Sequence, residues 1–204
     1  MRKTYAAILA GIMFLFDCHN CTSGNIKPYY DAFIRGMKKG LPVAYEYNIG
    51  QADSRYQFIA RMPGMTLFLT PGQAVLDVRD WLGHNGSVLQ ADIVGADSSA
   101  VADLGQAPES MANYFIGSDP SKWLTDVPVY SRVRYKNVYP GIDVEYHGDN
   151  GILEHDFIVA PNTDPSAIRM SFRGADGVRM DRDGNIEIAI GGKKLAWRKP
   201  VLYQ

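Results

Sequence analysis

The sequence predicts an all-β protein: an antiparallel β-sandwich-like domain preceded by a signal peptide and one short helix. Three observations indicate this fold class. Short runs of apolar and β-branched residues recur about every 8 to 12 residues. Gly, Pro, Asn and Asp residues separate these runs, as tight turns require. The 204 residues include 12 Tyr, 20 Gly and 11 Pro, a composition that favours strands joined by many turns.

The first residues are typical of an export leader. Arg2 and Lys3 give a positive start, and residues 5–16, YAAILAGIMFLF, are an uninterrupted apolar run. A membrane-spanning helix needs about 20 apolar residues, so this run fits the apolar part of a signal peptide better than a transmembrane span. We therefore predict a signal peptide over residues 1–23 and an exported protein that has no transmembrane span beyond this leader.

Residues 24–40 are predicted to be a linker that contains one short helix. Tyr29, Phe33 and Met37 recur at helical spacing before the pattern changes to that of strands. The β-sandwich domain is expected to occupy residues 41–204.

The two cysteines, Cys18 and Cys21, stand in the stretch CHNC within or beside the leader. A zinc site would need two further ligands, and the chain has no second cysteine pair. If the leader is removed after Cys21, the mature domain has no disulfide and depends on its hydrophobic core.

Turn signals divide the domain into strands. Pro71-Gly72 marks one turn, and Asn150-Gly151 is the strongest hairpin signal because Asn-Gly favours a type I′ turn. Residues 97–112 are small and polar, which predicts a surface loop. Residues 91–97, ADIVGAD, resemble residues 170–176, MSFRGAD, which is consistent with two matching strand ends.

The hairpin around Asn150-Gly151 carries an unusual density of ionisable groups. Alternate residues of a strand share a face, so a two-residue turn at this point pairs Glu145 with Asp156 and Val144 with Phe157. Under this register four carboxylates converge on one face of the hairpin: Asp143, Glu145, Glu154 and Asp156.

Like charges opposite one another destabilise a sheet unless cations compensate them. Arg132, Arg134 and Lys136 alternate with apolar residues on the preceding strand and could supply that compensation. The main interpretation is therefore a charged face balanced between neighbouring strands. Two alternatives stay open, a Ca²⁺ site made of carboxylate oxygens and a glycosidase-type pair of acids. The candidate binding residues are Asp143, Glu145, Tyr146, Glu154 and Asp156.

Other functional classes have little support. The formal net charge is −1, whereas a nucleic-acid partner requires a basic excess. The sequence has no G-x-S-x-G elbow, no dinucleotide-binding motif and no P-loop. Asp181-Arg182-Asp183-Gly184-Asn185 begins like a calcium loop but lacks the later Gly and Glu of that motif. We predict no catalytic residue, no metal ligand and no resident cofactor, with Ca²⁺ kept as the alternative.

Several long stretches resemble one family. Residues 41–78, LPVAYEYNIGQADSRYQFIARMPGMTLFLTPGQAVLDV, contain an N-x-G-Q-x-D motif, and residues 112–176 and the closing KPVLYQ continue the match. Together they resemble the N-terminal all-β domain of unknown function in secreted bacterial proteins that carry SBBP-type β-propeller repeats. The resemblance covers residues 41–204.

The resemblance implies a non-enzymatic structural or interaction module, secreted or at the cell surface. Its expected partners are downstream β-propeller-type repeats or cell-surface components. The family's acidic positions fall on Asp143, Glu154 and Asp156, and no established activity accompanies them. Family members usually continue beyond this point, so the domain is expected to be truncated at Gln204. The alternative function is a carbohydrate-binding or glycan-active domain that uses the acidic face and the tyrosines.

Overall fold

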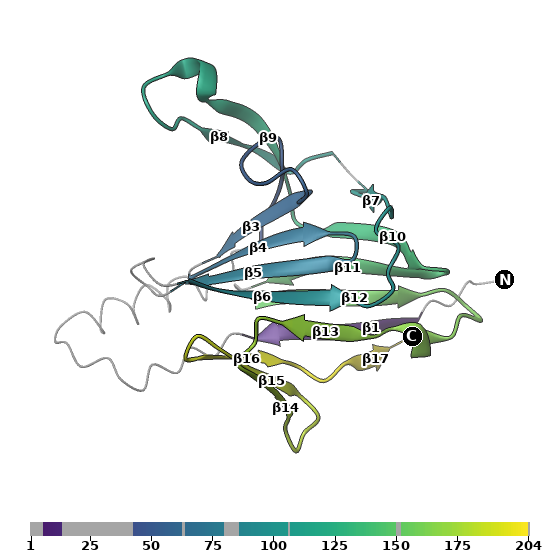
Figure 1. Ribbon diagram of the computed structural model, residues 1–204. Helices are drawn as coiled ribbons and strands as arrows, with labels where there is room; N and C mark the ends of the chain where they lie inside the picture. The colour runs from purple at the N-terminus through teal and green to yellow at the C-terminus, as the bar shows by residue number, and fades with distance from the viewer. Residues whose placement is uncertain are drawn as a thin grey trace.

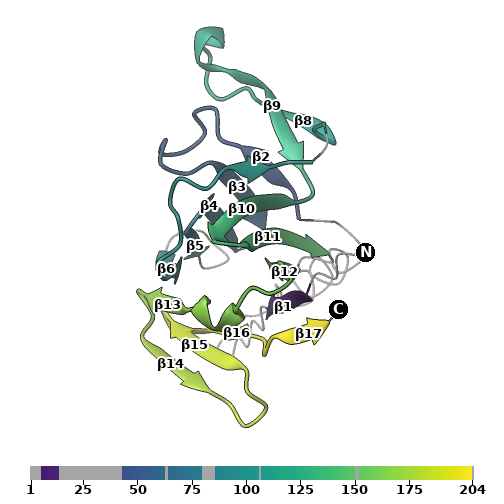
Figure 2. The ribbon, with the colours of Figure 1, turned by 90° about the vertical axis from the view of Figure 1, so that its right-hand side faces the viewer.

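The computed structural model describes residues 6–13, 43–62, 64–79, 86–105, 107–149 and 152–203. They form two antiparallel sheets packed in a sandwich-like arrangement (Figures 1 and 2). The helical segments within these residues are 3-10 turns of three residues each. The predicted all-β fold class is therefore confirmed.

Within the described residues, the regular elements are strands and two 3-10 turns. In chain order they are β1 (Ala6–Met13), β2 (Tyr45–Tyr47), β3 (Phe58–Met62), β4 (Met65–Thr70), β5 (Gln73–Arg79), β6 (Gly86–Ile93), β7 (Ala102–Asp103), β8 (Ser110–Tyr114), η1 (Pro120–Lys122), β9 (Leu124–Tyr130), β10 (Val133–Tyr139), β11 (Ile142–Asp149), β12 (Ile152–Val159), η2 (Pro165–Ala167), β13 (Met170–Arg173), β14 (Gly177–Met180), β15 (Ile186–Ile190), β16 (Lys193–Trp197) and β17 (Val201–Tyr203).

The first sheet has the strand order β14-β15-β16-β1-β12-β11-β10-β7, and β17 also pairs with β1. The second sheet has the order β13-β6-β5-β4-β3-β2-β9-β8. Within it, β3 to β6 are a meander in which each strand pairs with the next along the chain, and Pro71-Gly72 forms the predicted turn between β4 and β5. The two similar segments of the sequence lie on the adjacent strands β6 and β13, where Ile93 is opposite Met170.

The core lies between the two sheets and follows from the alternation of apolar residues. In β4, for example, Met65, Leu67 and Leu69 are buried, while the residues between them are half-buried. Successive side chains of a strand point to opposite faces, so each sheet presents an apolar inner face to the other. The buried cluster takes residues from both sheets, among them Phe58 and Leu76 from the second and Val144 from the first.

The N-terminal predictions are only partly within the described structure. Residues 6–13, from the predicted leader, form β1 and pair antiparallel with β12. The rest of the leader, the two cysteines and the helix predicted within residues 24–40 lie outside the described residues. The signal peptide and the linker helix therefore remain predictions.

The surface loop predicted for residues 97–112 is only partly correct. Ala102 and Asp103 form β7 against β10, and β8 begins at Ser110 against β9. The small polar composition of this stretch carries no strand signal of its own. Its strands exist because their backbone groups pair with neighbouring strands whose own residues favour β-structure.

Candidate functional site

The hairpin of β11 and β12 has the register that the sequence predicts. Glu145 is opposite Asp156, and Val144 is opposite Phe157. His147 stands opposite Glu154, two positions further along. Asp143, Glu145, Glu154 and Asp156 consequently share the outer face of the first sheet. We call this surface, together with Arg132, Arg134 and His147, the charged face.

Arginines compensate the carboxylates of β11. Asp143 Oδ2 accepts hydrogen bonds from Arg134 Nε at 2.9 Å and Nη2 at 2.6 Å, and Asp143 Oδ1 accepts one from the Asn137 backbone N–H at 2.7 Å. Arg132 Nη1 lies 3.4 Å from Glu145 Oε1. The predicted balance between neighbouring strands is therefore present for these two arginines. Lys136 instead pairs with Asp103 of β7 at 2.5 Å, because β7 covers the other edge of β10.

A histidine compensates the carboxylates of β12. His147 Nε2 lies 3.2 Å from Asp156 Oδ2, and His147 Nδ1 lies 3.6 Å from Glu154 Oε2. The hydrogen bond to Asp156 raises the pKa of His147 above its ordinary value of 6.5, and the negative charges of Asp156 and Glu154 act in the same direction. His147 thus contacts both carboxylates of β12, as the arginines contact those of β11.

Tyr146, the remaining candidate binding residue, lies on the opposite face of the sheet. It is 3% exposed and packs in the core, so the structure does not bring it together with the four carboxylates. Burial raises its pKa well above the usual range of a tyrosine.

His155 is buried beside Tyr146, as the alternation along β12 predicts. It is 2% exposed, and its ring is 5.9 Å from the Tyr146 ring and 4.9 Å from the Trp197 ring, measured between centroids. Neither ring nitrogen has a hydrogen-bond partner. Burial lowers the pKa of His155 to about 4 against the opposing influence of Asp156. His155 is therefore a neutral core residue near pH 7.

Tyr135 is a second buried group that lacks a hydrogen-bond partner, in this case at its hydroxyl. We expect Tyr135→Phe to stabilise the protein by about 1 kcal/mol, since it removes a polar atom whose burial is uncompensated. Tyr139→Phe is the matched control and should destabilise the protein, because the Tyr139 hydroxyl donates a hydrogen bond to the Val94 carbonyl at 2.6 Å. Urea unfolding of the three proteins measures both changes. A destabilised Tyr135→Phe variant would contradict the expectation.

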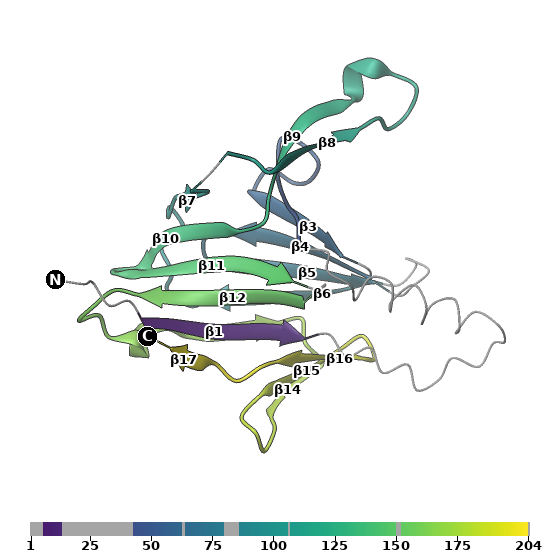
Figure 3. The same cartoon turned by 180° about the vertical axis from the view of Figure 1, so that it is seen from behind.

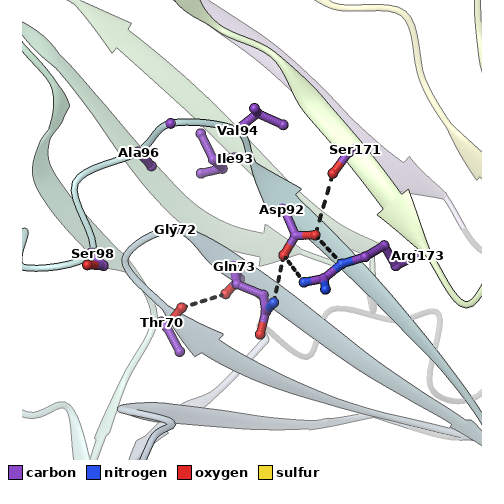
Figure 4. Close-up of a pocket in the computed structure, with 11 residues that line it drawn as sticks. Thr70, Gly72, Gln73, Asp92, Ile93, Val94, Ala96, Ser98, Ser171 and Arg173 are labelled. Carbon is purple, nitrogen blue, oxygen red and sulfur yellow. Dashed lines mark hydrogen bonds and ion pairs between the residues drawn. The ribbon is translucent and has the colours of Figure 1, made fainter.

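A shallow pocket on the second sheet holds another ion pair (Figure 4). Arg173 of β13 donates to both carboxylate oxygens of Asp92 on β6, at 2.8 and 3.0 Å, and Gln73 Nε2 donates to Asp92 Oδ1 at 2.6 Å. The hydrogen bond from Arg173 lowers the pKa of Asp92. The sequence did not predict a site at these residues. The only signal in the sequence was the similarity between residues 91–97, which contain Asp92, and residues 170–176, which contain Arg173.

These arrangements limit the chemistry of the charged face. Two of its carboxylates bind arginine, and the other two share one histidine. Among the side chains that the structure describes, no group of three or more His, Cys, Asp or Glu residues is arranged to hold a metal ion. The described geometry thus corresponds to the main interpretation, in which acidic side chains are compensated between neighbouring strands.

The fold and this face define an all-β sandwich domain whose outer surface carries networks of ion pairs. The chain belongs to the family described as Domain of unknown function (DUF7948), whose profile matches residues 45–204. The match begins at β2 and leaves β1 outside it. No match was found among curated proteins or among solved structures. Within the described residues, no helix has the length and apolar character needed to cross a bilayer.

Proposed function

We propose that this protein is a non-enzymatic structural or interaction module that is exported and acts outside the cell or at its surface. The partners proposed for it are β-propeller-type repeats that follow such a domain, or cell-surface components. The leader-like N-terminus and the resemblance to domains of SBBP-repeat proteins support the location and the partners.

The observation that carries the proposal is the internal compensation of the charged face. A glycosidase needs one carboxyl group poised to donate a proton and a second to act as base or nucleophile. Here Arg134 holds Asp143 with two short hydrogen bonds, and His147 lies between Glu154 and Asp156. These contacts fix the carboxylates to neighbouring strands, which serves the stability of the sheet.

Among the described residues, the aromatic ring that the glycan-binding alternative relies on does not lie on the charged face. Sugar recognition commonly uses an exposed aromatic ring whose face packs on the pyranose. Tyr146, the ring chosen for that role, is in the core. This placement favours a structural role of the charged face over a carbohydrate site.

Export of the full chain followed by a glycan assay tests the proposal. The chain carries a C-terminal tag and is expressed from its own Met1 in a bacterial host. We expect the tagged protein outside the cytoplasm, shortened near Ser23. The recovered protein should neither sediment with insoluble polysaccharides nor release reducing sugars from them, because its carboxylates are already paired.

The matched variants are Glu154→Gln and Asp143→Asn. Sedimentation or sugar release by the wild-type protein that both variants lose, with unchanged melting temperatures, would replace the proposal with the carbohydrate alternative. Retention of the full-length protein in the cytoplasm would contradict the proposed location.

A further inference from the structure

The β8–β9 hairpin and its connection form an arm, residues 110–130, that projects from the sandwich (Figures 1 and 3). Among the described strands, β8 is the last of the second sheet and pairs only with β9. Ser110, Met111 and Asn113 of β8 are exposed, and Ala112 and Tyr114 are half-buried. Exposed apolar side chains follow the arm: Met111 is 52% exposed, Phe115 62% and Ile116 73%.

Contacts at its base fix the arm to the body. The Tyr114 hydroxyl of β8 donates to the Glu46 carboxylate of β2. Arg61 Nη1 of β3 lies 2.7 Å from Glu46 Oε2 and donates to the Tyr114 hydroxyl at 2.9 Å. Burial and this hydrogen bond to Glu46 raise the pKa of Tyr114 to about 12. The three residues therefore join β8 to β2 and β3 across the intervening β9.

Contacts at the tip order the connection. Trp123 Nε1 donates to the Gly117 carbonyl at 3.2 Å, and the rings of Trp123 and Phe115 meet edge to face with centroids 5.1 Å apart. An arm that is ordered at both ends loses little conformational entropy when it binds. The exposed edge of β8 is therefore preorganised for pairing with another strand.

The sequence of β8 distinguishes it from the other edges. An edge strand presents unpaired backbone groups, and proteins commonly protect such strands with charged side chains or proline. The outer strand β13 contains Arg173 and the outer strand β14 contains Arg179. In contrast, β8 reads Ser-Met-Ala-Asn-Tyr and has neither a charge nor a proline. Of the described edge strands with four or more residues, β8 alone lacks a charged residue.

We propose that β8 is the interface through which two copies of this chain associate, by antiparallel pairing of β8 with β8 of the second copy about a two-fold axis. An uncharged strand meets no like-charge repulsion when it pairs with itself. The central residue of the strand, Ala112, lies on the axis opposite Ala112 of the second copy, where a small side chain allows close approach. Met111 of each copy then lies opposite Asn113 of the other.

A second copy is the occupant that this edge fits best. Pairing about a two-fold axis uses the same surface on both molecules and closes the assembly at two copies. It joins the second sheets of both sandwiches into one continuous sheet and covers the exposed Met111. The pairing concerns how copies associate and goes beyond the proposed function.

Light scattering during size-exclusion chromatography of the full chain tests the interface. We expect the wild-type mass to be that of two chains at high concentration and to fall towards one chain on dilution. Met111→Lys places the two lysines at diagonal positions on one face of the new strand pair, where they repel each other, and should shift the protein to a single chain. Met180→Lys, at a 72% exposed position on β14, is the matched control and should remain dimeric. Equal melting temperatures show that both variants are folded.

A disulfide at the axis tests the register. Ala112→Cys is made in a chain that also carries Cys18→Ser and Cys21→Ser, so that residue 112 is the only thiol. Directly opposite residues of an antiparallel pair have Cα atoms about 4.5 to 5.5 Å apart, within the reach of a disulfide. We expect a covalent dimer for Ala112→Cys and none for Met180→Cys. A monomeric wild-type protein at every concentration, or a dimer that keeps its mass in Met111→Lys and does not cross-link at residue 112, would overturn the proposal.

Discussion

Replacing His155 with leucine is expected to remove much of the acid sensitivity of this protein. The imidazole is buried among aromatic rings without a hydrogen-bond partner, and burial lowers its pKa from 6.5 to about 4. As the pH falls below 6.5, the unfolded chain binds a proton at this position while the folded protein does not. The free energy of unfolding is therefore not reduced by His155 above pH 6.5, and it decreases as the pH falls from 6.5 towards 4.

The size of the effect follows from the difference between the two pKa values. Each pKa unit corresponds to about 1.4 kcal/mol, so the contribution of His155 to acid destabilisation approaches roughly 3 kcal/mol near pH 4. Leucine has a similar volume and no charge. The free energy of unfolding of His155→Leu should consequently fall less steeply between pH 6.5 and 4 than that of the wild-type protein.

Urea unfolding at a series of pH values measures the difference. The groups that act electrostatically on His155 are Asp156 and His147, so the control is His147→Gln. The pKa of His147 is raised, and its contribution is present at low pH and is lost as the pH rises. The His147→Gln variant should keep the acid sensitivity that His155 causes. Parallel pH profiles of the wild-type and His155→Leu proteins would show that His155 is not the responsible group.

Gly174→Ala is expected to lower the free energy of unfolding more than either Gly192→Ala or Gly177→Ala. Gly174 follows β13 and has a φ of +83°, a conformation that L-residues rarely adopt. A Cβ there would also lie 2.2 Å from the Val88 carbonyl oxygen of β6. The neighbour is backbone within a paired strand and cannot move without breaking the sheet. We expect a loss of about 3 kcal/mol or more.

Two other glycines separate the two causes. Gly192 has a φ of +73° and no heavy atom within 4 Å of an added Cβ, so Gly192→Ala should cost about 1 kcal/mol from backbone strain alone. Gly177 has open space around the added atom and no positive φ, and Gly177→Ala should change stability by less than about 0.5 kcal/mol. Thermal unfolding of the three variants gives the ranking. A loss in Gly174→Ala no larger than that in Gly192→Ala would exclude the clash with Val88.

The β11–β12 hairpin shows how much of the candidate site could be predicted. The Asn150-Gly151 signal and the alternation of side chains were enough to place Glu145 opposite Asp156. In the structure the same alternation places His155, which lies between Glu154 and Asp156, on the inner side. These predictions succeed because a hairpin is local: the turn sets the register, and the register sets the faces.

The pairing of charges was less predictable. Arg134 binds Asp143 as the sequence implies, but Lys136 binds Asp103, and His147 compensates the carboxylates of β12. The position of Asp103 depends on β7, a two-residue strand inside a stretch that reads as loop. Short strands of this kind have no periodic signal, so their partners appear only when the sheet is assembled.

By itself, the sequence determined the all-β class, most strand positions and the faces of the central hairpin, because these depend on alternation and turn chemistry within short segments. The tertiary structure alone decided which strands lie at the edges and that the uncharged strand β8 is an edge strand in a projecting arm. It also decided that Asp92 meets Arg173 and that Gly174 passes close to β6. These features depend on contacts between residues far apart in the chain, and side-chain periodicity carries no information about which strands become neighbours.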